Sequence, residues 1–79
     1  MSAKVSFYHL SIDAIVLAER AVKAGDHREA ARQYDLAAQY QETMVGRLPA
    51  GRPKTHRIFS RSAATLRQRA RAQRRLNRP

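Results

Sequence analysis

Residues 25–37 read Gly-Asp-His-Arg-Glu-Ala-Ala-Arg-Gln-Tyr-Asp-Leu-Ala, and this stretch decides the fold. Gly25 supplies the left-handed residue with which a helix commonly ends, and Asp26 is a preferred N-cap for the next helix. Asp26 and Glu29 also form a variant of the capping box, in which each side chain can accept a hydrogen bond from the other's backbone N–H. The stretch therefore predicts a tight turn between two helices.

A helix is predicted on each side of this turn, over about residues 7–24 and 27–45. Apolar side chains recur at helical spacing in the first of these segments. They are Tyr8, Ile12, Ile15 and Val22. In the second segment, the predicted inner face consists of Ala30, Tyr34, Ala37 and Met44. Because the connection is so short, the two helices are expected to pack antiparallel.

A third helix is needed because one hairpin cannot bury its own apolar face. Four residues with the spacing i, i+4, i+7 and i+11 predict this helix over about residues 58–75. They are Phe59, Ala63, Leu66 and Ala70. Prolines and glycines predict a loop over residues 46–57, and residues 77–79 are expected to fray. We therefore expect an all-α fold, a three-helix antiparallel bundle forming one domain over residues 1–76.

Charge divides the chain into two unlike parts. Residues 1–45 carry five basic and six acidic residues, whereas residues 46–79 carry eleven basic and none acidic, which together give a net charge of +10. The expected partners of such a polycation are phosphate backbones, anionic lipid head groups and acidic protein segments. Thirteen of the sixteen basic residues are arginine, a bias that a GC-rich genome would also produce. Composition alone leaves open whether the arginines are functional.

Several classes of protein are disfavoured. The chain has no cysteine, which excludes disulfides and thiolate metal sites. Its longest apolar run, residues 14–18, is far shorter than the ~20 residues of a membrane span and too short for a signal peptide. The three histidines have no ligand spacing, and no pattern of nucleophile and base or of phosphate-binding glycines occurs. We expect a cytoplasmic, non-enzymatic protein without metal or other cofactor.

Residues 25–37 follow the pattern G-D-x-x-E-A-x-x-x-Y-x-x-A and resemble the helical hairpins of tetratricopeptide-like proteins. One such hairpin followed by a third helix resembles the MIT domain, the microtubule-interacting and trafficking module. The resemblance covers residues 8–45 by motif and residues 58–76 by pattern. It implies a three-helix bundle that binds short peptide segments in grooves beside its third helix. Family members that bind basic, leucine-containing peptides carry acidic residues on that helix.

The third helix of this chain carries arginines instead, so the resemblance implies an acidic or amphipathic partner segment. The expected function is that of a protein–protein adaptor. Charge-assisted contacts are assigned to four arginines, and the apolar floor of the groove is assigned to Met44 and Leu66. The arginines are Arg61, Arg67, Arg71 and Arg74.

An alternative is a small nucleic-acid-binding protein that contacts phosphates with residues 47–78. Its phosphate contacts are assigned to a second set of arginines. They are Arg57, Arg69, Arg75 and Arg78. Aromatic residues are not interleaved with these arginines, which favours phosphate-driven binding over base stacking. A loose resemblance to a helical small-subunit ribosomal protein, at Ala24-Gly25-Asp26, His56 and Ala63-Ala64, points the same way. Tyr8 and Tyr34 are expected in the core, and a homo-oligomer is compatible with either function.

Overall fold

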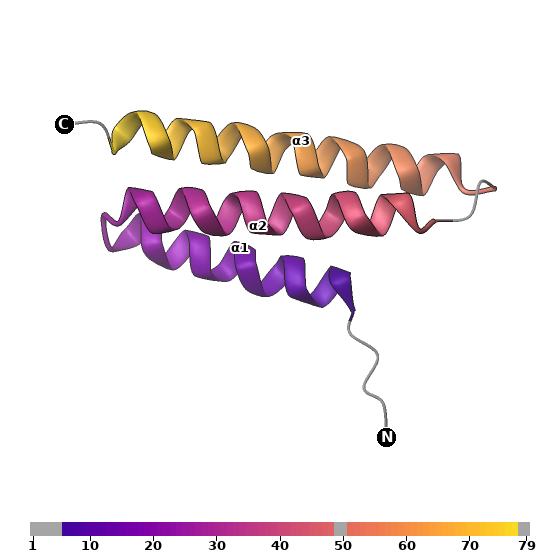
Figure 1. Ribbon diagram of the computed structural model, residues 1–79, viewed down its shortest axis with the longest axis horizontal. Coiled ribbons are helices and arrows are strands. Elements are labelled where there is room, and N and C mark those ends of the chain that lie inside the picture. Colours follow the sequence, from indigo (N-terminus) through magenta and orange to yellow (C-terminus); the bar gives the residue numbers. More distant parts are fainter. Residues whose placement is uncertain (1–5, 49–50, 78–79) are drawn as a thin grey trace, which may run out of the picture.

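The computed structural model describes residues 6–48 and 51–77, which form three antiparallel helices (Figure 1). Helix α1 spans Phe7–Lys23, α2 spans His27–Gly46 and α3 spans Pro53–Leu76. The described residues contain no strand. The expected all-α three-helix bundle, a hairpin followed by a basic third helix, is confirmed.

The turn between α1 and α2 is closed by backbone hydrogen bonds. Gly25 has φ +75°, and its N–H donates to the carbonyl of Val22 at 3.0 Å. The N–H of Asp26 donates to the carbonyl of Ala21 at 2.8 Å, which completes a Schellman motif. The carboxylate of Asp26 accepts from the N–H of Glu29 at 3.1 Å and so caps α2.

The second half of the predicted capping box does not form. The N–H of Asp26 is already bonded to α1, so it is not available to the Glu29 carboxylate. Glu29 instead accepts hydrogen bonds from Arg32 at 2.6 Å and from Gln33 at 2.8 Å. These bonds lower the pKa of Glu29, and the bond from Arg32 has the larger effect.

Helix α3 begins at Pro53, so the predicted loop over residues 46–57 is too long and the predicted start near residue 58 is too late. Proline disfavours the helical conformation of the residue before it. At the first position of a helix, however, its missing N–H costs nothing and its fixed φ is already helical. Asn77 caps α3. The rest of the predicted tail, residues 78–79, lies outside the described part of the chain.

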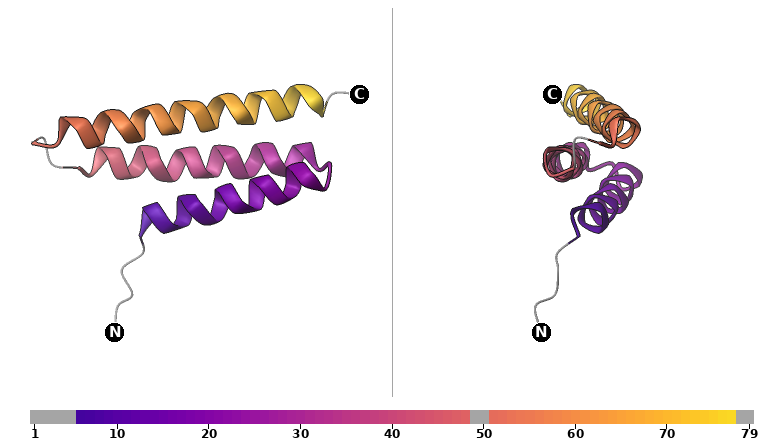
Figure 2. Two further views of the ribbon diagram at one scale, coloured as in Figure 1. Left: turned by 180° about the vertical axis from the view of Figure 1, so that it is seen from behind. Right: turned by 90° about the vertical axis from the view of Figure 1, so that its right-hand side faces the viewer.

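Helix α2 lies in the middle, and α1 and α3 each pack along it without their backbones approaching one another. Viewed end-on, the two outer helices stand on the same side of α2 (Figure 2). They meet at one end, where the rings of Tyr8 and Phe59 lie edge to face with centroids 6.1 Å apart. The core is built mainly of alanines of α1 and α2, which let the helix axes approach closely.

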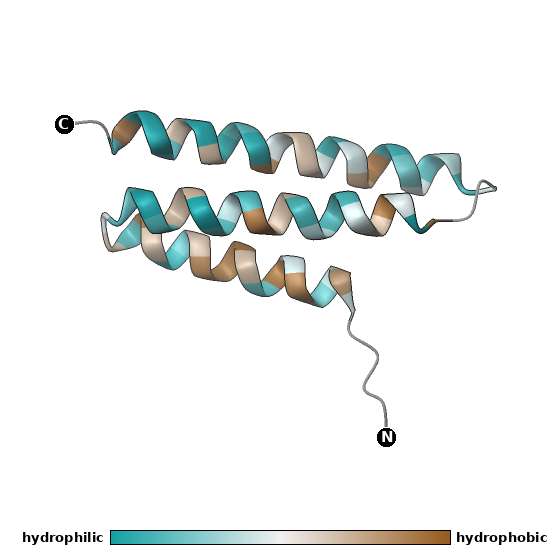
Figure 3. Ribbon diagram, in the orientation of Figure 1, coloured by the Kyte–Doolittle hydropathy of each residue, from teal (hydrophilic) through white to brown (hydrophobic). Residues whose placement is uncertain are grey.

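The core differs from the predicted one on α1. Tyr8 and Ile12 were expected inside but are 46% and 38% exposed, because α3 packs on α2 and leaves this side of α1 uncovered. Tyr34 is buried as expected. Figure 3 shows the contrast between α1, which is largely hydrophobic, and α3, which is largely hydrophilic. Within the described ranges, no helix has the length and apolar character needed to cross a bilayer.

Candidate interaction surfaces on α1 and α3

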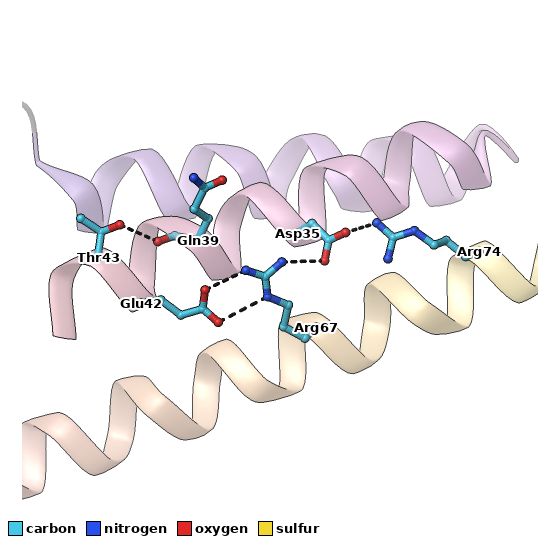
Figure 4. A network of polar contacts seen from close by, with 6 residues as sticks. All are labelled: Asp35, Gln39, Glu42, Thr43, Arg67 and Arg74. Carbon is cyan, nitrogen blue, oxygen red and sulfur yellow. Dashed lines mark hydrogen bonds and ion pairs between the residues drawn. The ribbon is translucent and has the colours of Figure 1, made fainter. Parts of the chain in front are cut away.

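The arginines of α3 fall into three groups, and the first group faces α2 (Figure 4). Arg67 donates to Asp35 at 3.1 Å and to Glu42 at 2.7 Å and 3.3 Å. Arg74 pairs with the other carboxylate oxygen of Asp35. The hydrogen bond to Glu42 raises the pKa of Arg67, partial burial opposes it, and Asp35 adds to the increase. Arg67 and Arg74, both predicted to bind a partner, are thus engaged within the molecule.

The second group is Arg69 alone. Its guanidinium carbon lies 6.0 Å from the centroid of the Tyr34 ring, within the range of a cation–π contact. The side chain therefore leans over α2 beside the core, although Arg69 itself is exposed.

The third group forms no hydrogen bond or ion pair with α2 within the described residues. Four arginines are exposed and, with two uncharged exposed residues, repeat at i, i+4, i+7, i+11, i+14 and i+18 along one face of α3. We call this face the outer stripe; its residues are Arg57, Arg61, Ala64, Gln68, Arg71 and Arg75. Among the described residues, none of its arginines forms an ion pair. The opposite face of α3 carries the buried Ala63, Leu66 and Ala70.

The predicted six-residue partner site is not assembled. Leu66 is only 3% exposed and belongs to the core, so it cannot touch a partner while α3 stays in place. Met44 is half-buried on α2. Arg61 and Arg71 lie on the outer stripe, together with Arg57 and Arg75 from the alternative nucleic-acid set. Of the other two members of that set, Arg69 lies over the Tyr34 ring and Arg78 lies outside the described residues.

An exposed apolar surface on α1 was missed by the sequence analysis. Four of the six exposed large apolar residues in the described chain lie on this helix. They are Tyr8 at 46%, Ile12 at 38%, Val16 at 42% and Leu17 at 46%. Tyr8, Ile12 and Val16 follow one another at intervals of four residues; we call them the α1 stripe. The helical spacing was present in the sequence, but spacing alone does not tell whether a neighbour covers the face.

A hollow of about 630 Å³ lies between α2 and α3. Both basic and acidic side chains line it, and most of them neutralise one another. The pairs are Arg32 with Glu29, Arg67 with Asp35 and Arg74 with Asp35. An acidic group that binds Arg32, Arg67 or Arg74 would have to displace these carboxylates, whereas Arg28, which also lines the hollow, forms no ion pair within the described residues. Across the described part of the chain, no group of three His, Cys, Asp or Glu side chains could hold a metal ion.

Comparison with known proteins finds no match. No family model matches this chain, and neither a curated protein nor a solved structure is significantly similar to it. Function is therefore inferred from the surfaces of the molecule itself.

Proposed function

We propose that this chain is a non-enzymatic adaptor module of the MIT-like or tetratricopeptide-like kind, which binds an amphipathic helix of another protein. The observation that carries the proposal is the exposed α1 stripe. A folded chain of this size gains by burying such side chains, and a contiguous exposed apolar surface is typical of an interaction site. The stripe has the periodicity with which one helix packs on another.

The position of α1 favours a helical partner with an acidic side. Tyr8 touches Phe59 of α3, so the α1 stripe begins beside α3 and winds from there along α1. A partner helix packed on the stripe would therefore have α3 beside it at the Tyr8 end. Helix α3 carries eight basic residues and no acidic one, so acidic groups on the partner's α3-facing side are favoured.

The hollow between α2 and α3 is less suited to an acidic segment. Its arginines Arg67 and Arg74 already have carboxylate partners, Asp35 and Glu42. Exchanging one exposed ion pair for another gains little, because each contributes only ~0–1 kcal/mol. Apolar burial on α1 replaces no existing contact, so it gives the larger free-energy gain.

The proposal is tested by selecting displayed helical peptides of random sequence on the intact protein. We expect selected peptides to carry apolar residues at i, i+3/i+4 and i+7 with acidic residues on one flank. Fluorescence polarisation then gives their affinity for variants of the protein. Ile12→Asp places a charge in the middle of the apolar contact and should weaken binding by tenfold or more.

Leu76→Asp is the matched control, because Leu76 is also an exposed apolar residue, at 61%, but lies at the end of α3. It should leave the affinity of peptides that contact the α1 stripe within about twofold. Circular dichroism verifies that both variants remain helical. Equal affinity of the selected peptides for Ile12→Asp and for the parent protein would show that the α1 stripe is not the binding surface.

A further inference from the structure

The outer stripe of α3 has an ordered charge pattern that the adaptor function does not require. Arg57 and Arg61 form one pair, Arg71 and Arg75 form a second, and the uncharged Ala64 and Gln68 separate them. All six residues are exposed. With a rise of 1.5 Å per residue, the centres of the two pairs lie ~21 Å apart along the helix axis.

These arginines keep their full charge for an external partner. The two acidic side chains of α2 that reach α3, Asp35 and Glu42, are bonded to Arg67 and Arg74. Helix α3 itself contains no acidic residue. Four cations in two pairs on one straight face therefore present a fixed pattern of positive charge to solvent.

We propose that the outer stripe binds the phosphate backbones of duplex DNA, with α3 lying across the major groove and one arginine pair on each strand. The major groove is ~12 Å wide between its phosphate-lined walls. Pairs ~21 Å apart span that width with room for an arginine side chain and a phosphate on either side. Ala64 and Gln68 then lie above the open groove, where no phosphate needs a cation.

The composition of the stripe favours a duplex over a single strand or a membrane. Single-strand binders stack bases on exposed aromatic rings, and the outer stripe has none. The aromatic ring of α3, Phe59, packs against Tyr8 instead. A helix that binds at a lipid surface needs a continuous row of bulky apolar side chains beside its cations, and α3 exposes only Ile58 and Leu76, which lie near its two ends. Phosphate contacts alone make the binding independent of base sequence.

The test measures the affinity of a labelled ~20-base-pair DNA duplex of arbitrary sequence by fluorescence polarisation between 50 and 200 mM NaCl. Four phosphate contacts predict that log K falls against log[salt] with a slope of about −3.6, which is a loss of roughly 150-fold over this range. The double substitution Arg71→Gln/Arg75→Gln leaves two contacts, so the slope should fall to about −1.8.

The matched control is Arg20→Gln/Lys23→Gln, which removes the same charge from two exposed residues of α1. Its slope should stay near −3.6 if the stripe makes the contacts. Equal losses in both double variants would show that net charge alone drives binding, and would overturn the proposal.

Other nucleic acids test the geometry. Double-stranded RNA has a deep, narrow major groove, so it should bind more weakly than DNA at equal salt. RNA binding that is as tight as DNA binding, or tighter binding of a single strand, would also overturn the proposal. The inference does not depend on the adaptor function: Ile12→Asp should leave DNA affinity unchanged.

Discussion

Asp26 acts at the boundary of two helices. Its backbone N–H ends α1 by bonding to Ala21, and its side chain begins α2 by accepting from the N–H of Glu29. Gly25, directly before it, has the left-handed backbone that this geometry requires. Two adjacent residues thus satisfy the last carbonyls of one helix and a first N–H of the next, so the hairpin turn needs no further residue.

Gly25→Ala should destabilise the protein although the added methyl group meets no atom within 4 Å. The cost comes from the backbone alone, because a left-handed conformation is unfavourable for alanine by about 1–2 kcal/mol. In a domain of this size, 1 kcal/mol corresponds to a melting temperature lower by about 4–8 °C. Thermal unfolding followed by circular dichroism at 222 nm measures the change.

Gly46→Ala is the control, and its expected effect on stability has the opposite sign. Gly46 is the last residue of α2, it has no left-handed φ, and a methyl group there also meets nothing within 4 Å. Alanine restricts the unfolded chain and favours helix, so stability should rise by up to ~1 kcal/mol. Destabilisation by both substitutions would mean that the backbone conformation of Gly25 is not the cause.

At the level of the elements, α3 is attached to α2 by a narrow apolar face with ion pairs beside it. Leu66 is the one bulky side chain among its buried residues, the others being Ala63 and Ala70. The exposed ion pairs of Arg67 and Arg74 contribute ~0–1 kcal/mol each, whereas burial of a leucine contributes ~1.5–3 kcal/mol. Leu66 therefore dominates the attachment.

Leu66→Ala should lower the free energy of unfolding by about 2–5 kcal/mol, because the small neighbouring alanines cannot fill the space. Apart from the contact of Tyr8 with Phe59, α1 packs on α2 and not on α3, so hydrogen exchange should accelerate most in α3. Chemical denaturation and amide exchange measure the two effects. Leu76→Ala, at a residue 61% exposed on the same helix, should change stability by less than ~0.5 kcal/mol. Similar losses at Leu66 and Leu76 would contradict this assignment.

At the level of the whole molecule, charge and apolar surface are separated. The Cα trace extends 46 × 32 × 14 Å, a flat shape with the apolar α1 along one edge and the basic α3 along the other. Each edge is exposed because only α2 lies between them. A flat arrangement of this kind can present two different surfaces, one to an apolar partner and one to an anionic partner.

Added salt should stabilise the free protein. Helix α3 has more cations than the acidic residues that pair with Arg67 and Arg74. Its outer stripe includes like-charged pairs at i, i+4, which repel one another. Raising the ionic strength from 0.01 to 0.15 M shortens the Debye length from about 30 to 8 Å and screens this repulsion. The melting temperature should therefore rise by a few degrees.

The control for the salt effect is Arg71→Gln/Arg75→Gln, which removes one repulsive pair and should have a smaller salt dependence. A melting temperature that falls on adding salt would show instead that the attractive pairs of Arg67 and Arg74 dominate the electrostatic energy.

The sequence alone determined the helices and the hairpin. Gly25 and Asp26 act through hydrogen bonds to residues at most five positions away, so their effect is visible in the local sequence. The inward spacing of Ala63, Leu66 and Ala70 was also sufficient to place the buried face of α3. The start of α3 was predicted too late because proline has two effects. It disfavours the helical conformation of the residue before it, but it is favourable at the first position of a helix, where Pro53 lies.

Only the tertiary structure decided which apolar and charged side chains are free. Ile12 and Leu66 lie on equally regular helical stripes, yet Ile12 is 38% exposed and Leu66 is 3% exposed. The arginines of α3 look alike in sequence, but Arg67 finds carboxylates 25 and 32 residues away, while Arg71 points to solvent. Helical periodicity defines the faces of a helix; the packing of α1 and α3 on α2 alone determines which faces are covered.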